Sequence, residues 1–252
     1  MSLWHRILRR WAANAGYDLV PLPPKSERLD IHLQRLFHHL NINCVFDVGA
    51  NRGQYGRFLR QWGYQGRIIS FEPVAADYAH LKAKAAGDPD WHTHQIALGR
   101  EEETAEINVT SDSLFNSFLT PNDFMVGQGL RISHTEPVQL RPLDAVFEQC
   151  LAGLERPQLY LKLDTQGYDP AVLAGAEKAL SRVTALQTEL SVKPVYEQMP
   201  YYLDSIAHLE QLGFEITGLF PIARDNALRV IEFDCVMVQT AAAGQTTGLF
   251  PP

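Results

Sequence analysis

The chain has few of the features that mark membrane-spanning, secreted or nucleic-acid-binding proteins. Nowhere do its 252 residues approach the roughly 18 uninterrupted apolar residues that a membrane-spanning helix needs. The first residues lack the apolar run of a signal peptide. The net charge of −7 provides no basic excess to neutralise phosphates, so we expect no nucleic-acid partner.

Cysteine is scarce as well. Cys44, Cys150 and Cys235 are widely separated and form neither a CxxC pair nor a zinc-like spacing. We therefore expect reduced, mostly packed thiols in a cytoplasmic protein, and we assign no metal ligands among them.

The rest of the composition, 46% hydrophobic and 20% charged, is typical of a globular protein. The segment "PLPP" at 21–24 indicates a boundary. We expect an N-terminal helical extension over 1–40, a main domain over 41–240 and a flexible tail over 241–252. In residues 4–11, apolar residues at helical spacing lie beside arginines. This short helix could cover its own domain, pack on the partner of a homodimer, or make weak peripheral contact with an anionic membrane.

Strands and helices alternate from residue 43 onward. Buried strands are predicted at 44–49, 66–73, 91–99, 158–167 and 183–192, and helices at 53–63, 75–86, 169–180 and 203–213. This βαβ rhythm predicts a parallel sheet with helices on its faces. Two late strands, at 214–220 and 230–239, are joined by a loop short enough for an antiparallel pair.

The loop "DVGANRG" (47–53) ends the first predicted strand and brings glycine-rich backbone toward a ligand. It departs from the dinucleotide fingerprint GxGxxG, because Asn51 stands where the second glycine lets a pyrophosphate approach. A Walker GxxxxGK[ST] run is missing from the sequence. Tyr78 and Lys82 have the spacing of a short-chain dehydrogenase pair, but they follow the second strand too early to reach a nicotinamide.

Two acidic residues at strand ends indicate a different ligand. Asp47 and Glu72 end neighbouring strands, whose tips share the carboxyl edge where open α/β sheets bind ligands. Glu72 can accept both hydroxyl hydrogens of a ribose, and Asp47 suits an ammonium group better than a pyrophosphate. S-adenosylmethionine, a phosphate-free nucleoside with an amino-acid tail and a sulfonium charge, meets both demands. Each residue also has a purely structural explanation, Asp47 as a turn cap and Glu72 as an exposed strand end.

Four segments in order resemble the FkbM family of class I, S-adenosylmethionine-dependent methyltransferases: "VFDVGANRGQYG", "ISFEP", "IALG" and "YLKLDTQGYDPAVLAGAEKAL". The resemblance covers roughly residues 43–220. It implies a Rossmann-like α/β sandwich with a seven-stranded, mostly parallel sheet whose last strand is antiparallel. It also implies methyl transfer to a hydroxyl oxygen, often on a sugar, a glycan or a secondary metabolite.

Carried over by position, the resemblance implies a set of cofactor-binding residues. These are Asp47, Gly49, Ala50, Asn51 and Gly53 beside the methionine part, Glu72 with Pro73 at the ribose, Ile96, Ala97 and Leu98 at the adenine, and Ser117. Ser117 is included because relatives often show paired serines at this stretch, where Asn116 could also contact the cofactor or the acceptor. Gly49 and Gly53 could instead serve only the geometry of the turn.

A hydroxyl that attacks a sulfonium methyl must lose its proton, which calls for a base or a metal. Asp164, at the end of the strand over 158–167, is the first candidate for base, substrate-orienting group or metal ligand, although it could merely cap the next helix. Many relatives carry KxDxEGxE here. This chain has Gln166 and Asp169 instead, and losing the middle carboxylate puts a divalent metal in doubt.

Three further residues could join Asp164. Lys162 alternates with Asp164 and could pair with an acid, or be structural. Glu189 could supply a second carboxylate on the same rim or be structural. His134 could reach the pocket as a base, or be an ordinary loop histidine.

The polar stretch 111–137 is too long for an idle connection, so we expect it to be an acceptor-binding lid. Its phenylalanines Phe115, Phe118 and Phe124 could stack on a sugar or an apolar acceptor, or fill the local core.

The sequence therefore predicts a cytoplasmic S-adenosylmethionine-dependent methyltransferase that acts on oxygen of a small-molecule or glycan acceptor. One alternative is a methyltransferase-fold binding protein that has lost the reaction, which Gln166 favours. The other is a nicotinamide-dependent oxidoreductase, which requires Asn51 to accommodate a pyrophosphate.

Overall fold

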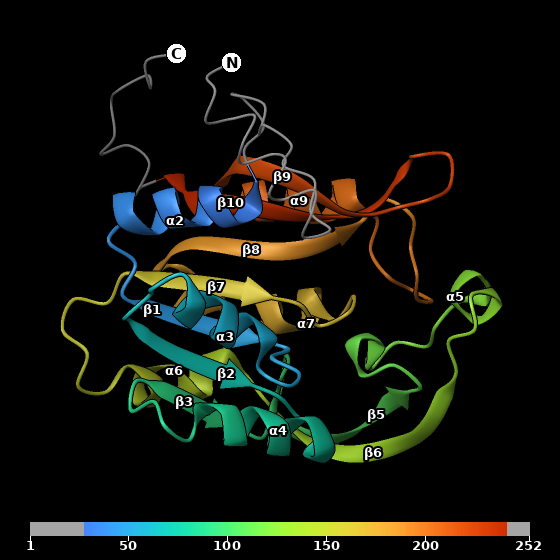
Figure 1. The fold of residues 1–252 in the computed structure, drawn as a ribbon, viewed down its shortest axis with the longest axis horizontal. Helices are drawn as coiled ribbons and strands as arrows, with labels where there is room; N and C mark the ends of the chain where they lie inside the picture. Colours follow the sequence, from blue (N-terminus) through green and yellow to red (C-terminus); the bar gives the residue numbers. More distant parts are fainter. Residues whose placement is uncertain (1–27, 241–252) are drawn as a thin grey trace, which may run out of the picture.

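Seven strands form the central sheet (Figure 1). The computed structural model describes residues 28–240. The strand order is β3-β2-β1-β7-β8-β10-β9. The strands are β1 (Cys44–Val48), β2 (Arg67–Phe71), β3 (Trp91–His94), β7 (Leu159–Leu163), β8 (Val183–Ser191), β9 (Phe214–Arg224) and β10 (Val230–Gln239). Five neighbouring strands, β3, β2, β1, β7 and β8, are mutually parallel. Strand β10 runs antiparallel to both of its neighbours, β8 and β9. The predicted seven-stranded, mostly parallel sheet is confirmed.

Helices cover both faces of this sheet. One face packs against α2 (Leu29–His39), α3 (Gln54–Gln61) and α4 (Ala75–Ala85), and the other against α6 (Leu143–Leu151), α7 (Asp169–Ala174), α8 (Glu177–Leu180) and α9 (Tyr202–Gln211). The two-residue period of a strand divides the side chains between the faces. In β1, Val45 packs with the first set of helices and Phe46 with the second.

A second, three-stranded sheet stands beside the carboxyl edge of the first (Figure 1). It contains β4 (Ala97–Leu98), β5 (Glu103–Thr110) and β6 (Ile132–Arg141). Its apolar core includes Val74, Ile107 and Leu140.

The structure corrects three element boundaries. The strand expected at 91–99 splits into β3 and β4, which belong to different sheets. The helix expected at 169–180 is divided into α7 and α8 around Gly175, where a Cβ atom would lie 1.9 Å from the carbonyl oxygen of Gly99. The polar stretch 111–137 contains a 3-10 turn, η1 (Ser113–Phe115), the helix α5 (Asp123–Gly127) and the first half of β6. The start of β6 is exposed, so no apolar alternation marks it as a strand.

Some expectations concern regions outside the described residues. The amphipathic segment 4–11 and the tail 241–252 lie there, as does most of the expected extension 1–40. Between residues 28 and 240, the structure contains no helix with the length and apolarity needed to cross a membrane. Cys44, Cys150 and Cys235 are free and buried.

The close packing of α3 on β3 gives a stability prediction. A Cβ atom at Gly56 would lie 2.2 Å from the ring of Trp91, which is 7% exposed and donates a hydrogen bond to Ser70 at 3.0 Å. We expect Gly56→Ala to lower the free energy of unfolding by about 1–3 kcal/mol, because overpacking outweighs the gain in helix propensity. Urea denaturation measures this change.

The matched control is Gly127→Ala in α5, where a Cβ atom meets nothing within 4 Å. This variant should be neutral or stabilised by up to about 1 kcal/mol. Equal stability of Gly56→Ala and the wild type would show that α3 does not pack on Trp91 as described.

Candidate cofactor and active site

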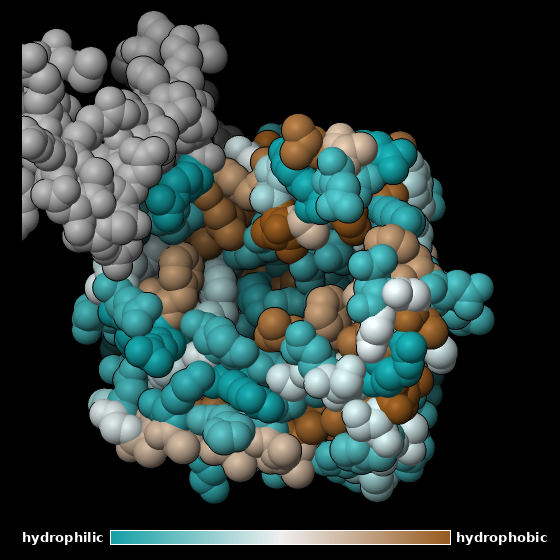
Figure 2. All heavy atoms as spheres, turned by 45° about the vertical axis from the view of Figure 1, so that its right-hand side comes forward, coloured by the Kyte–Doolittle hydropathy of each residue, from teal (hydrophilic) through white to brown (hydrophobic). Residues whose placement is uncertain are grey.

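A cleft opens at the carboxyl edge of the central sheet, where Figure 2 shows the molecular surface to be hollowed. Its walls come from the ends of β1, β2 and β7, from the second sheet and from the segment 113–118. It encloses about 630 Å³ of empty space, part of which is open to solvent.

The loop after β1 brings three strand ends together. The backbone N–H groups of Gly49 and Ala50 both donate to the carbonyl oxygen of Phe71, at 3.1 and 3.0 Å. Gly49 has φ +77°, and a Cβ atom there would lie 1.9 Å from the carbonyl oxygen of Asp164. Glycine is therefore required for steric reasons where β1 approaches the end of β7.

Glu72 is fixed at the end of β2. Its carboxylate accepts hydrogen bonds from the backbone N–H groups of Asn51, at 2.8 Å, and Val74, at 2.9 Å. The side chain is only 5% exposed, and burial raises the pKa of Glu72 to about 7. A carboxylate has about four acceptor positions, so two remain for hydroxyl groups of a ligand.

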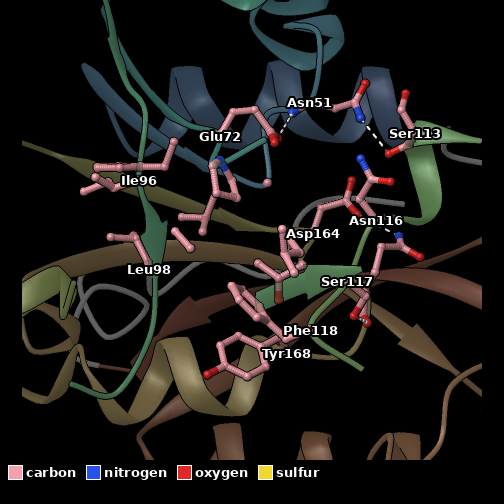
Figure 3. A pocket seen from close by; sticks show the side chains of 18 of the residues that line it. Asn51, Glu72, Ile96, Leu98, Ser113, Asn116, Ser117, Phe118, Asp164 and Tyr168 are labelled. Carbon is pink, nitrogen blue, oxygen red and sulfur yellow. Dashed lines mark hydrogen bonds between the residues drawn. The ribbon is translucent and has the colours of Figure 1, made fainter. Parts of the chain in front are cut away.

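The remaining walls of the cleft are largely apolar. Figure 3 shows Ile96 and Leu98 across the cleft from Asn116 and Ser117. The rings of Phe118 and Tyr168 lie together with centroids 4.6 Å apart.

The segment around η1 is anchored over the cleft by side-chain amides. The Asn51 amide donates to the carbonyl oxygen of Ser113 at 2.8 Å (Figure 3), and the Asn116 amide donates to Asp77 at 3.0 Å. Ser117 Oγ donates to the backbone carbonyl oxygen of Gln166 at 2.9 Å. These bonds connect the insert to the loop after β1, to α4 and to the segment after β7.

Beneath the cleft, Lys162 lies between two carboxylates. Asp47 stands in register with Ser70 of β2 and with Lys162 of β7. Lys162 Nζ is 3.2 Å from Asp47 Oδ1 and 3.1 Å from Asp164 Oδ2, and Ser70 Oγ donates to Asp47 at 3.1 Å. Of the two roles that the sequence left open for Lys162, pairing with an acid is observed here, and the pairing is buried. Burial lowers the pKa of Lys162, but the two carboxylates outweigh burial and raise it.

Asp164 is the charged member of this group that faces the cleft, with 36% of its side chain exposed. Burial acts to raise the pKa of Asp164, but the Lys162 charge and hydrogen bonds outweigh it and lower that pKa. Burial raises the pKa of Asp47, although the Lys162 charge acts in the opposite direction.

Gln166 connects Asp164 to Glu189. Its amide nitrogen is 3.0 Å from Asp164 Oδ1 and 2.9 Å from Glu189 Oε2, and its amide oxygen accepts a hydrogen bond from Tyr196 at 3.0 Å. Burial and the nearby Asp164 charge raise the pKa of Glu189 well above its ordinary value. The two carboxyls therefore differ, because the pKa of Asp164 is lowered and that of Glu189 is raised.

The structure brings nine of the predicted site residues to the wall of the cleft. They are Gly49, Asn51, Glu72, Pro73, Ile96, Ala97, Leu98, Ser117 and Asp164. Among residues 28–240, no three His, Cys, Asp or Glu side chains are grouped so that they could hold a metal ion.

Four predicted residues are not brought to the wall of the cleft. Asp47 is fully buried against Lys162, and Ala50 is buried in the core beneath the loop. Gly53 begins α3, and a Cβ atom there would meet Leu81 at 3.0 Å. His134 lies exposed on β6, where the antiparallel pairing with β5 places it opposite Val109. It is not part of the wall of the cleft.

Sequence reasoning missed several residues of the cleft. These are Ser113, Leu114, Thr165 and Tyr168 in the wall, and Tyr196 behind Gln166. Thr165 and Tyr168 follow the end of β7 at the carboxyl edge, a signal that could have identified them. The segment 113–114 and Tyr196 have no comparable pattern around them.

The sheet is Rossmann-like, and its cleft lies at the carboxyl ends of the strands, where open α/β sheets bind their ligands. Residues 47–216 match the methyltransferase FkbM domain, and the chain belongs to this family.

Individual proteins that the chain resembles have low sequence identity to it. The chain is 25% identical over 186 residues to the 2-O-methyltransferase NoeI of Sinorhizobium fredii (strain NBRC 101917 / NGR234). The aligned region covers 70% of this chain and 74% of NoeI. An rRNA methylase from Streptococcus thermophilus superposes with a TM-score of 0.45 at 12% identity, over 85% of this chain and 98% of that one. Magnesium protoporphyrin IX methyltransferase (ChlM) from Synechocystis PCC 6803, with bound SAM, gives 0.44 at 11% identity, over 93% and 96% of the two chains.

The buried ion pair gives the prediction for this region. We expect Lys162→Met to lower the free energy of unfolding by about 3–5 kcal/mol, because Asp47, which is 0% exposed, would keep a charge without its partner. Denaturant titration measures the change.

The matched control is the double variant Asp47→Asn with Lys162→Met, which removes both charges. It should regain most of the lost stability. A double variant as unstable as Lys162→Met alone would contradict the assignment of the loss to the unpaired Asp47 charge.

Proposed function

We propose that the protein transfers the methyl group of S-adenosylmethionine to a hydroxyl oxygen of a sugar, a glycan or a natural-product intermediate. The observation that carries this proposal is the ionised, partly exposed Asp164 in the cleft, held by Lys162 at 3.1 Å. The relative NoeI is named a 2-O-methyltransferase, which supports oxygen as the acceptor atom.

The cleft fits the cofactor in three respects. Glu72 retains two acceptor positions for the hydroxyls of a ribose. Ile96, Ala97 and Leu98 offer an apolar wall for the adenine. The carboxylate of Asp164, whose pKa is lowered, suits a sulfonium cation. When bound, S-adenosylmethionine supplies an electrophilic methyl group.

Asp164 then has two tasks at the acceptor. Its carboxylate accepts the hydrogen bond of the acceptor hydroxyl and so directs the oxygen lone pair toward the methyl carbon. During transfer of the methyl group that the cofactor would supply, Asp164 would accept the proton of the acceptor hydroxyl and release it to water. A hydroxyl becomes strongly acidic as its oxygen gains the methyl group, so a carboxylate with a low pKa is a sufficient base.

The first prediction concerns cofactor binding. Calorimetry should detect saturable binding of S-adenosylhomocysteine, and Glu72→Gln should weaken it by about 1–3 kcal/mol at pH 8, the scale of a hydrogen bond to a charged group. Since the pKa of Glu72 is about 7, wild-type affinity should fall as the pH drops through 7 and the carboxylate gains a proton. The affinity of Glu72→Gln should not follow that titration.

The control is Glu101→Gln, which changes an exposed carboxylate outside the cleft and should bind like the wild type. Binding of NADH without binding of S-adenosylhomocysteine would contradict the proposal and favour an oxidoreductase.

The second prediction concerns the reaction. Asp164→Asn should reduce single-turnover transfer of a labelled methyl group to a panel of glycan acceptors by about 100-fold or more, the scale of a lost general base. Affinity for S-adenosylhomocysteine should change little, because the substitution preserves the shape of the side chain.

Asp90→Asn, at an exposed position, serves as the matched control. An unchanged rate in Asp164→Asn would remove Asp164 from the mechanism. If the wild type binds S-adenosylhomocysteine but methylates no acceptor in the panel, the binding-protein alternative is favoured.

A further inference from the structure

A second cavity lies beside the cleft, at the same edge of the central sheet. It has a volume of about 210 Å³ and is enclosed by the start of α7, the end of β8, the segment 199–200 and α9. The residues after β7 separate it from the cleft, since Asp164 to Gln166 line the cleft and Gly167 lines the second cavity.

The wall of the second cavity is mainly apolar. Its apolar members are Pro170, Leu173, Leu190, Met199, Pro200 and Leu209.

The buried polar side chains of this wall are bonded to the protein. Asp169 accepts hydrogen bonds from Thr188 Oγ1 at 2.5 Å and from the backbone N–H of Thr165 at 3.1 Å. Ser191 Oγ donates to Glu232 at 2.6 Å. Since these buried groups already have partners, an apolar group that enters leaves none of them without one. The exposed side chains of Asp204 and His208 lie at the α9 side of the wall.

Glu189 links the two cavities. It lines the second cavity, while its carboxyl shares the Gln166 amide nitrogen with Asp164, at 2.9 and 3.0 Å. Burial and the nearby Asp164 charge raise the pKa of Glu189, which disfavours a charge on the side that meets an apolar ligand.

The side chain of Gln166 joins the two cavities at one atom. Its amide nitrogen donates to Asp164, in the wall of the cleft, and to Glu189, in the wall of the second cavity. Gly167 packs beside it, since a Cβ atom there would lie 2.9 Å from the side chain of Leu119 and 3.1 Å from that of Met199. A molecule whose hydroxyl meets Asp164 therefore has the second cavity on the other side of the Gln166 amide.

We propose that the second cavity binds an apolar substituent, an acyl chain or an aryl ring, of the acceptor that is methylated. The proposal rests on the function proposed above and narrows the substrate to an amphiphilic hydroxyl compound. An apolar cavity of roughly 150 Å³ binds benzene, so the volume of about 210 Å³ suits a six-carbon ring or chain.

Straight-chain primary alcohols are the smallest probes that combine a hydroxyl with an apolar arm. We would titrate protein labelled with ¹³C at the methionine methyl groups, saturated with S-adenosylhomocysteine, with ethanol, 1-butanol and 1-hexanol. The Met199 methyl resonance, assigned with Met199→Leu, should shift on binding, while that of Met237 in the core should not. Affinity should rise about three- to fourfold for each added methylene.

A matched pair of variants on α9 tests the location. Ser205 lines the cavity from a half-buried position, so Ser205→Phe should fill it and reduce 1-hexanol affinity at least tenfold. Ala207 is exposed on the same helix and is not part of the wall, so Ala207→Phe should bind 1-hexanol like the wild type. Both variants should keep the affinity for S-adenosylhomocysteine.

Three outcomes would overturn the proposal. The first is a Met199 signal that no alcohol shifts, and the second is equal binding by Ser205→Phe and the wild type. The third is competition between 1-hexanol and S-adenosylhomocysteine, which would place the alcohol in the cleft. Failure of the proposed function gives a different result. The wild type would then not bind S-adenosylhomocysteine, while 1-hexanol would still shift the Met199 signal. The cavity would bind apolar groups in that case, but they could not be assigned to a methyl acceptor.

Discussion

The buried ammonium of Lys162 is the interaction on which the site depends. It lies 3.2 Å from a carboxylate that has no access to solvent and 3.1 Å from one that faces the cleft. Asp47 thus fixes the ammonium under the sheet edge, and the ammonium keeps Asp164 ionised where an acceptor can reach it. A buried charge is costly unless it is paired, so the three side chains stabilise one another and cannot be changed singly without loss.

Backbone approach is the second constraint. The carbonyl oxygen of Asp164 leaves no room for a Cβ atom at Gly49, and the backbone N–H of Asn51 reaches the carboxylate of Glu72. The ends of β1, β2 and β7 are thereby fixed relative to one another before any ligand enters. The Gln166 amide nitrogen bonds both Asp164, which faces the cleft, and Glu189, which lines the second, mainly apolar cavity. This juxtaposition is well suited to holding a hydroxyl beside an apolar arm.

The elements that could be predicted from the sequence are those with a regular apolar pattern. The strands β1, β7, β8 and β10 belong to this group, because each is buried over much of its length. The start of β6 could not be predicted, since its exposed residues give no alternation and only pairing with β5 makes them a strand. The division of the expected helix at Gly175 depends on contact with Gly99, which is remote in the sequence.

The sequence by itself determined the family, the alternation of strands and helices along the chain, and the residues at the strand tips, such as Gly49 and Glu72. These follow from local patterns, because a turn after a buried strand must reach the carboxyl edge of the sheet. Only the tertiary structure decided which way each side chain faces and what it meets there. Asp47 faces Lys162 instead of the cleft. His134 lies on β6 where this strand pairs with β5, outside the wall of the cleft. Strand register and side-chain burial set these outcomes, and both depend on contacts between segments far apart in the chain.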